Sequence, residues 1–210
     1  MNSKFFTARR ITAFAILLAL VVVMQTLGAT INIGPVQLNF TLIPIALGAI
    51  MLGPIAGALL GLACGIVVLI QVIMGLVPFY VLIWTESPFV ASLTCLVKTT
   101  AAGLVAGILF KSIRKKNFYV AVFVASAIVP IINTALFIVG CLGMWDAMVM
   151  IAGGTNILGF IIVSLVTFNF FAELGVNLLC APALYRVVRA IDKTGNYYAD
   201  AQENAQDNEE

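Results

Sequence analysis

The segment Gly53–Gly65 reads GPIAGALLGLACG, and its glycines recur every four residues, at Gly53, Gly57, Gly61 and Gly65. Residues with this spacing lie along one face of an α-helix. The segment carries no charge, and Pro54 suits the first turn of a helix, where its missing N–H costs little. A helix face without side chains lets a second helix approach until the backbones nearly touch, which is how helices associate in lipid. The segment therefore predicts a packing ridge within a bundle of membrane helices.

The composition of the whole chain also indicates a membrane protein. Of its 210 residues, 62% are hydrophobic, and the mean hydropathy is +1.13. These values are typical of a single domain that crosses a bilayer several times. The chain has no histidine, which is the commonest general base and metal ligand. Its four cysteines are isolated in apolar runs without the spacing of metal ligands, so we expect no metal, no cofactor and no redox site.

The distribution of basic residues predicts the topology. Ten of the eleven lie in three clusters, within residues 4–10, 111–116 and 186–193. The positive-inside rule places all three clusters in the cytoplasm, so the number of crossings between successive clusters is even. The apolar length fits four spans of about 20 residues before the second cluster and two after it. The sequence thus predicts an all-α membrane protein, a bundle of six transmembrane helices with both termini cytoplasmic.

Turn residues and polar stretches separate the six predicted spans, which are residues 11–28, 39–52, 54–75, 89–110, 118–141 and 157–183. A signal peptide is the competing interpretation of the first run, but five further spans follow it. External loops are expected at residues 29–38, 77–88 and 142–156, the first as an extended segment or short hairpin. Residues 1–191 form the predicted membrane domain. The polar, acidic residues 192–210 are predicted to be a disordered cytoplasmic tail.

Two charged residues, Lys98 and Glu173, are predicted to lie at membrane depth. Lys98 lies thirteen residues before Lys111, and Glu173 lies thirteen before Arg186. At 1.5 Å per helical residue, each lies about 20 Å from a basic cluster. Equal depth predicts an ion pair between the fourth and sixth spans. Two interpretations stay open: the pair fixes helix register, or Lys98 is the counter-ion of an anionic ligand that Glu173 replaces when the site is empty.

Most remaining polar side chains are predicted to lie in the external loops or at the outer ends of the helices. A ring of polar groups on one side of the membrane suits a small polar ligand that is captured from outside. Together with the charges at membrane depth and Asn133 in the fifth span, the candidate substrate-binding residues are Asn39, Tyr80, Trp84, Glu86, Lys98, Asn133, Asn156 and Glu173.

The run LNFTLIPIALGAIMLGPIAGALLGLACG, residues 38–65, resembles the second-to-third helix region of substrate-binding S components of energy-coupling factor (ECF) vitamin transporters. The ESPF stretch at residues 86–89, the pair Ala15 and Ala19, and the six-helix layout agree with this resemblance, which covers roughly residues 8–190. The resemblance implies that the chain captures a vitamin from outside. It also implies association with a transmembrane T component and two cytoplasmic ATPases. The chain has no phosphate-binding GxxxxGK[ST] motif of its own. We predict that Ala15 and Ala19 contact the T component.

The resemblance is nearest to the group that binds pantothenate, riboflavin, folate or cobalamin, and pantothenate is our preferred substrate. Two other function classes are weighed against it. An intramembrane enzyme would depend on Lys98 and Glu173, because no histidine is present. An envelope scaffold would leave Lys98 and the external polar ring unexplained. We therefore predict a transport protein of the bacterial plasma membrane with no catalytic residues and no nucleic-acid partner.

Overall fold

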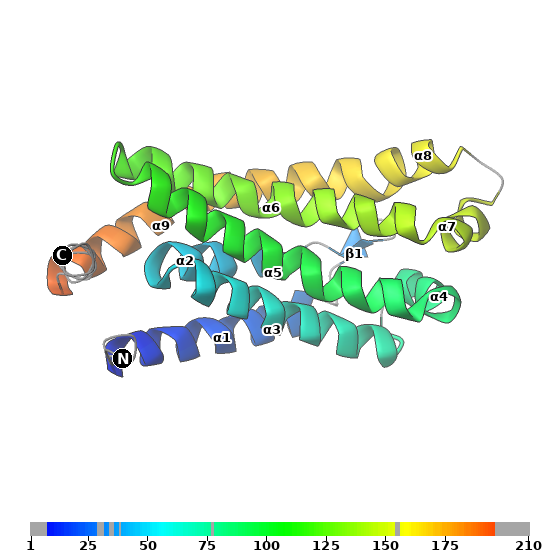
Figure 1. Cartoon of the computed structure of the whole chain (residues 1–210), viewed down its shortest axis with the longest axis horizontal. Coiled ribbons are helices and arrows are strands. Elements are labelled where there is room, and N and C mark those ends of the chain that lie inside the picture. The colour runs from blue at the N-terminus through cyan, green and yellow to red at the C-terminus, as the bar shows by residue number, and fades with distance from the viewer. Residues whose placement is uncertain are drawn as a thin grey trace, which may run out of the picture.

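The computed structural model describes residues 8–28, 32–33, 36–37, 39–76, 78–153 and 156–195. These residues form an elongated bundle in which the long helices run side by side (Figure 1). In chain order the elements are α1 (Ala8–Gly28), β1 (Asn32–Ile33), β2 (Val36–Gln37), α2 (Leu42–Leu52), α3 (Pro54–Ile73), α4 (Pro78–Glu86), α5 (Pro88–Ile113), α6 (Phe118–Gly143), α7 (Trp145–Ala152), α8 (Ile157–Gly159), the π-helical segment η2 (Phe160–Thr167) and α9 (Phe168–Gly195).

Among the described residues, five helices are long and apolar enough to cross a membrane: α1, α3, α5, α6 and the part of α9 from Asn169 to Ile191. The bent pair Trp145–Ala152 and Ile157–Val163 makes a sixth if it counts as one span. These helices confirm the prediction of an all-α membrane protein with several spans. The segment predicted as the second span forms only the 11-residue helix α2. At 1.5 Å per residue this helix is about 16 Å long, which is half of a hydrocarbon core of about 30 Å. Helix α2 therefore does not cross the membrane by itself.

The predicted loops contain more regular structure than expected. Residues 77–88 include helix α4, and residues 142–156 include helix α7. Both segments are apolar, and a helix satisfies their backbone hydrogen bonds internally where lipid offers no partners. In the first predicted loop, β1 and β2 pair Asn32 with Gln37 and Ile33 with Val36, which confirms the short hairpin. Helix α9 continues to Gly195, and the rest of the predicted tail lies outside the described residues.

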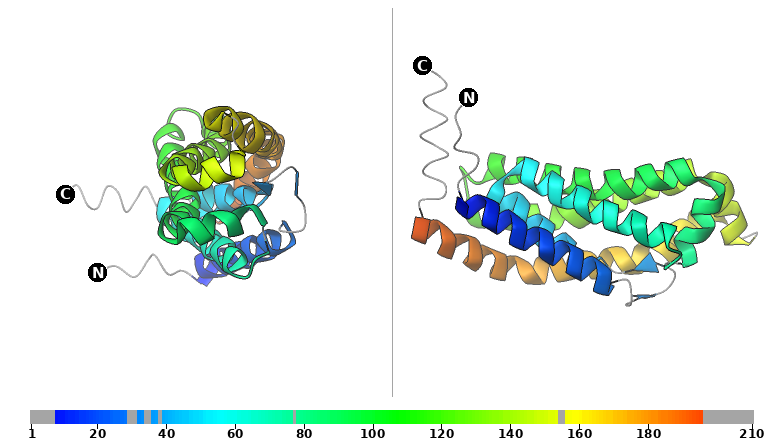
Figure 2. Two further views of the ribbon diagram at one scale, coloured as in Figure 1. Left: turned by 90° about the vertical axis from the view of Figure 1, so that its right-hand side faces the viewer. Right: turned by 90° about the horizontal axis from the view of Figure 1, so that it is seen from below.

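The two ends of the bundle differ in chemistry. The start of α1, the turn between α5 and α6, and the end of α9 lie at one end, which we call the basic end (Figures 1 and 2). Basic residues are found in each of these three segments. Helices α4 and α7 lie at the opposite end, which we call the loop end. The chain therefore returns to the same end of the bundle between successive basic clusters, as the prediction from the basic residues requires.

The predicted glycine ridge packs against α5. A Cβ atom on Gly57 would lie 2.6 Å from the carbonyl oxygen of Gly103, and one on Gly61 would lie closer still to the carbonyl oxygen of Thr99. The Thr99 hydroxyl donates a 2.7 Å hydrogen bond to the Gly61 carbonyl oxygen. Gly53 differs from the others because its φ of 99° ends α2 and begins α3 in a conformation that favours glycine. The ridge therefore fixes α5, the helix that carries Lys98, against α3 by backbone contact.

Candidate ligand-binding site

Most of the described polar side chains that are buried lie between the middle of the bundle and the loop end. Such groups are costly in an apolar interior unless they have hydrogen-bond partners, and in membrane helices they mark candidate functional sites. They come from α1, the residue before α2, and helices α3, α5, α6 and α9. The set comprises Gln25, Thr41, Gln71, Lys98, Thr99, Ser126, Asn133, Asn169, Glu173 and Asn177.

Lys98 on α5 is 6% exposed and lies among aromatic side chains. Its ammonium donates to the Tyr80 hydroxyl of α4 across 3.5 Å. It lies 5.7 Å from the ring centroid of Tyr80 and 5.2 Å from that of Phe137 on α6. Aromatic rings at these distances attract a cation. Burial raises the pKa of the Tyr80 phenol, so its hydroxyl keeps its proton and can serve as a hydrogen-bonding group beside Lys98.

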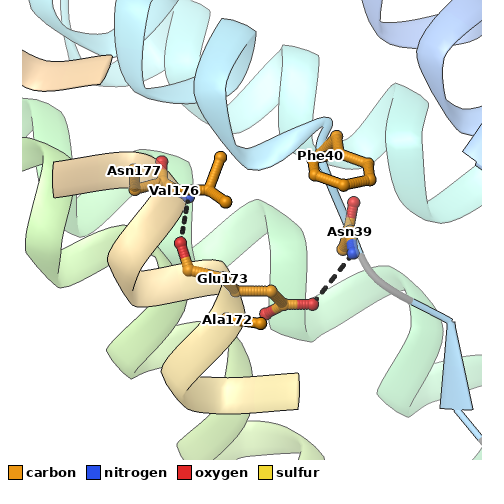
Figure 3. A pocket seen from close by; sticks show the side chains of 6 residues that line it. All are labelled: Asn39, Phe40, Ala172, Glu173, Val176 and Asn177. Atoms are coloured by element: carbon orange, nitrogen blue, oxygen red, sulfur yellow. Dashed lines mark hydrogen bonds between the residues drawn. The ribbon is translucent and has the colours of Figure 1, made fainter. Parts of the chain in front are cut away.

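Glu173 on α9 is 8% exposed and is held by groups from other elements. Its Oε1 accepts a 3.0 Å hydrogen bond from the backbone N–H of Asn39, just before α2. Asn133 of α6 lies beside the same carboxyl group. One helical turn further along α9, Asn177 Nδ2 donates to the Glu173 carbonyl oxygen across 2.9 Å. Figure 3 shows the Glu173 side chain directed toward the Asn39 backbone.

Glu173 forms part of a small cleft between α9 and the start of α2. The cleft is nearly closed, with an internal volume of about 10 Å³, roughly the room that one water molecule needs, whereas ligand pockets usually hold about 300–1,000 Å³. A vitamin would therefore need the walls to move apart. The lining residues are Asn39, Phe40, Ala172, Glu173, Val176 and Asn177 (Figure 3).

The predicted ion pair between Lys98 and Glu173 is not formed. Within the described part of the chain, no contact of 4.0 Å or less joins their charged groups, and each has other partners. Helix α5 packs against α2, α3 and α6, whereas α9 packs against α2 and α6, so α2 and α6 lie between the two charged helices. The charges interact only at longer range. Equal depth in the bundle was not sufficient to place them side by side.

The structure groups only some of the predicted binding residues. Tyr80 and Lys98 meet, and Asn39, Asn133 and Glu173 meet. Trp84 is half-buried on α4 and packs on the apolar core. Glu86 is exposed at the end of α4. Asn156 is also exposed, and its Oδ1 accepts the backbone N–H groups of Leu158 and Gly159, which caps α8.

A buried network that the sequence analysis missed adjoins Asn39. Gln25 of α1 donates its Nε2 to Gln71 Oε1 of α3, and Gln71 Nε2 donates to the Gln25 carbonyl oxygen, both across 3.2 Å. The Thr41 hydroxyl donates to Gln25 Oε1 across 3.4 Å and also contacts Asn39 Oδ1 and Cys64 Sγ. Gln25 and Gln71 each lie near the outer end of a predicted span. Comparing the depths of polar residues, as was done for Lys98 and Glu173, would therefore have identified this pair.

The predicted partner-binding residues Ala15 and Ala19 are both exposed on α1. Ala8 and Thr12, at similar spacing, are exposed as well. The buried face of α1 carries Leu17, Val21, Gln25 and Gly28 instead. The small-residue stripe is therefore not used for packing within the bundle and is available to a second protein.

The family model described as ECF transporter, substrate-specific component, matches residues 9–185. The match includes both alanines and every candidate binding residue. The chain belongs to this family. This S component is therefore an integral membrane transport protein and not an enzyme, and it acts on a small-molecule substrate together with T and ATPase partners. No curated protein and no solved structure gives a significant match to the chain.

Proposed function

We propose that this S component captures a small anionic vitamin, with pantothenate as the preferred candidate, and delivers it with ATP that two partner ATPases hydrolyse. The observation that supports an anionic ligand is the environment of Lys98. The ammonium is buried among Tyr80 and Phe137, and no carboxylate of the described residues lies within 4.0 Å of it. Because an unpaired cation at membrane depth is costly, a ligand carboxylate would be a favourable partner.

The single cation and the small cleft also rank the candidate substrates. Pantothenate has a single carboxylate on a small, flexible body, so one cation suits it and the cleft needs to open less for it than for a bulkier vitamin. Riboflavin has no carboxylate to pair with Lys98. Folate carries a pair of carboxylates, and cobalamin is much larger than the cleft at Glu173. Riboflavin, folate and cobalamin are therefore kept as alternative substrates, each less suited to this site than pantothenate.

The segments that wall the site come from the loop end, which supports entry of the ligand from that end. Tyr80 lies on α4, and Asn39 connects the β1–β2 hairpin to α2. Movement of α4 or of the hairpin would therefore change the contacts of Lys98 or Glu173 directly. We assign residues 29–38 and 77–88 the role of a lid over the ligand.

We assign the basic end to the cytoplasm of a bacterial plasma membrane, because basic residues flank cytoplasmic ends of spans. Asn117 is exposed in the turn between α5 and α6 and tests this assignment. Asn117→Cys should react with a membrane-impermeant maleimide only after the cells are permeabilised. Asp146→Cys, exposed on α7 at the loop end, is the matched control and should react in intact cells. Labelling of Asn117→Cys from outside would contradict the assignment.

The isolated protein should bind its vitamin without ATP or partners. A ligand that binds only the folded state stabilises it by about 2.7 kcal/mol at one hundred times its Kd, so pantothenate should raise the melting temperature. Trp84 lies one turn from Tyr80 on α4, and the only other tryptophan is Trp145. In a Trp145→Phe variant the fluorescence of Trp84 should change on binding. A screen of vitamins that changes neither fluorescence nor melting temperature would contradict the proposed function.

A further inference from the structure

Two buried asparagines have side-chain oxygens to which no described residue donates, Asn133 Oδ1 and Asn177 Oδ1. Asn177 is 1% exposed and Asn133 is 5% exposed. The orientation of the Asn177 amide is determined, because its Nδ2 donates to the Glu173 carbonyl oxygen. The oxygen is therefore the atom that lacks a partner. A buried acceptor without a donor destabilises a folded protein, and an apolar side chain of similar size would avoid that cost.

The unpaired oxygen of Asn177 belongs to the cleft already described. Asn177 and Glu173 both line it, and Asn133 lies beside the Glu173 carboxyl group (Figure 3). Two donors near this cleft, the Asn39 backbone N–H and Asn177 Nδ2, are already engaged. The Oδ1 atoms of Asn177 and Asn133 receive no hydrogen bond from a described residue, and a carboxylate can accept more hydrogen bonds than the one that Glu173 Oε1 accepts from the Asn39 N–H. A ligand group that donates hydrogen bonds would complement them.

We propose that Asn177 and Glu173 form a specificity subsite for a hydrogen-bond donor of the ligand, either a hydroxyl or an N–H group. The inference rests on the proposed function, which places the ligand carboxylate at Lys98. Helices α2 and α6 lie between α5, which carries Lys98, and α9, which carries the subsite. One ligand can therefore reach both only if its carboxylate and its hydrogen-bond donor are at opposite ends of the molecule. The substrate class is therefore an extended carboxylic acid with a hydroxyl or N–H group remote from the carboxylate.

A cycle of protein variants and ligand variants tests the subsite. Asn177→Leu removes the acceptor with little change in size. Pantothenate is compared with an analogue that lacks both hydroxyls and with an analogue that has an ester in place of the amide. Asn177→Leu should bind pantothenate about tenfold more weakly than the wild type, as expected for one hydrogen bond in a buried site. For the analogue that lacks the recognised donor, the wild type and Asn177→Leu should have equal affinity, which identifies the hydroxyl or the N–H group.

Two further variants separate recognition from folding. Ser112→Ala removes a hydroxyl outside the candidate site, which donates to the Ile108 carbonyl oxygen near the basic end of α5, and should bind every ligand as the wild type does. Glu173→Gln keeps an oxygen that accepts the Asn39 N–H and should also weaken the binding only of ligands that carry the recognised donor. This variant provides the test if Asn177→Leu does not fold. Ligand-free Asn177→Leu should melt no lower than the wild type, because an unpaired acceptor has been removed.

The contradicting results are distinct for the two proposals. Suppose that a vitamin binds the wild type, and that Asn177→Leu and Glu173→Gln prefer it over its donor-deleted analogues by the same affinity ratio as the wild type. The subsite is then wrong, and the proposed function stands. If the vitamin that binds has no carboxylate or no hydroxyl or N–H group, the substrate class is wrong. If no vitamin stabilises the wild type, the proposed function fails and the subsite with it.

Discussion

Lys98→Met is expected to weaken the binding of an anionic vitamin by about 2–5 kcal/mol, the range for removing one partner of a buried charge contact. This corresponds to a loss of affinity of roughly 30-fold to 4,000-fold. Methionine has a similar length and can pack on the rings of Tyr80 and Phe137, which Lys98 approaches within 5.7 Å and 5.2 Å of their centroids. The ligand-free variant should therefore fold, and its melting temperature should not fall.

Titration calorimetry with two ligands measures this effect. Wild-type protein should bind pantothenate more tightly than pantothenol, in which an alcohol replaces the carboxylate, and Lys98→Met should lose that preference. Lys98→Arg, which keeps the charge, is the control and should retain part of the preference. A folded Lys98→Met protein with unchanged affinity for pantothenate would contradict the role of Lys98. Neutral groups such as Asn39 and Tyr80 would then account for binding.

Replacing both Ala15 and Ala19 by tryptophan is expected to reduce copurification with the T component and the ATPases to background. Both alanines are exposed on α1, so large side chains there extend away from the bundle and leave its core unchanged. Close approach of another membrane helix requires small residues at the contact. The candidate ligand-binding residues lie on other elements, so the vitamin should bind the double variant as tightly as the wild type.

Val139→Trp is the matched control for this double variant, because Val139 is an exposed residue on a different helix, α6. It should copurify normally with the partners. Copurification and vitamin binding are measured on the same preparations, which separates lost docking from lost folding. If the Ala15 and Ala19 double variant copurifies as well as Val139→Trp, the T component docks on a different surface.

The helix packing could be predicted from the sequence only in part. The spacing of Gly57 and Gly61 identified a bare face, and the structure confirms that this face packs closely. The spacing contains no information about which helix fills the face, so α5 could not be named as the neighbour. Helices α4 and α7 were predicted as loops, because short apolar segments between spans resemble interfacial loops when only composition is considered.

The candidate site shows a similar limit. Rise per residue places Lys98 and Glu173 at equal depth, but depth says nothing about which helices are neighbours, and the predicted ion pair was wrong for that reason. Asn156 precedes a helix, which is a signal for capping and not for ligand binding. Gln25 and Asn177 were missed because only charged residues were compared by their depth in the spans.

Uptake of labelled pantothenate tests most directly whether this chain supplies recognition while its partners supply energy. Cells that cannot take up the vitamin are given the chain alone, the chain with a T component and two ATPases, or the full set with an ATPase that cannot hydrolyse ATP. We predict accumulation only with the full active set, and cell-bound label no greater than the amount of protein in the other two. The proposed division of roles would be contradicted if cells with the chain alone accumulated as much pantothenate as cells with the full active set. It would also be contradicted if the isolated chain bound pantothenate but cells with the full active set accumulated none.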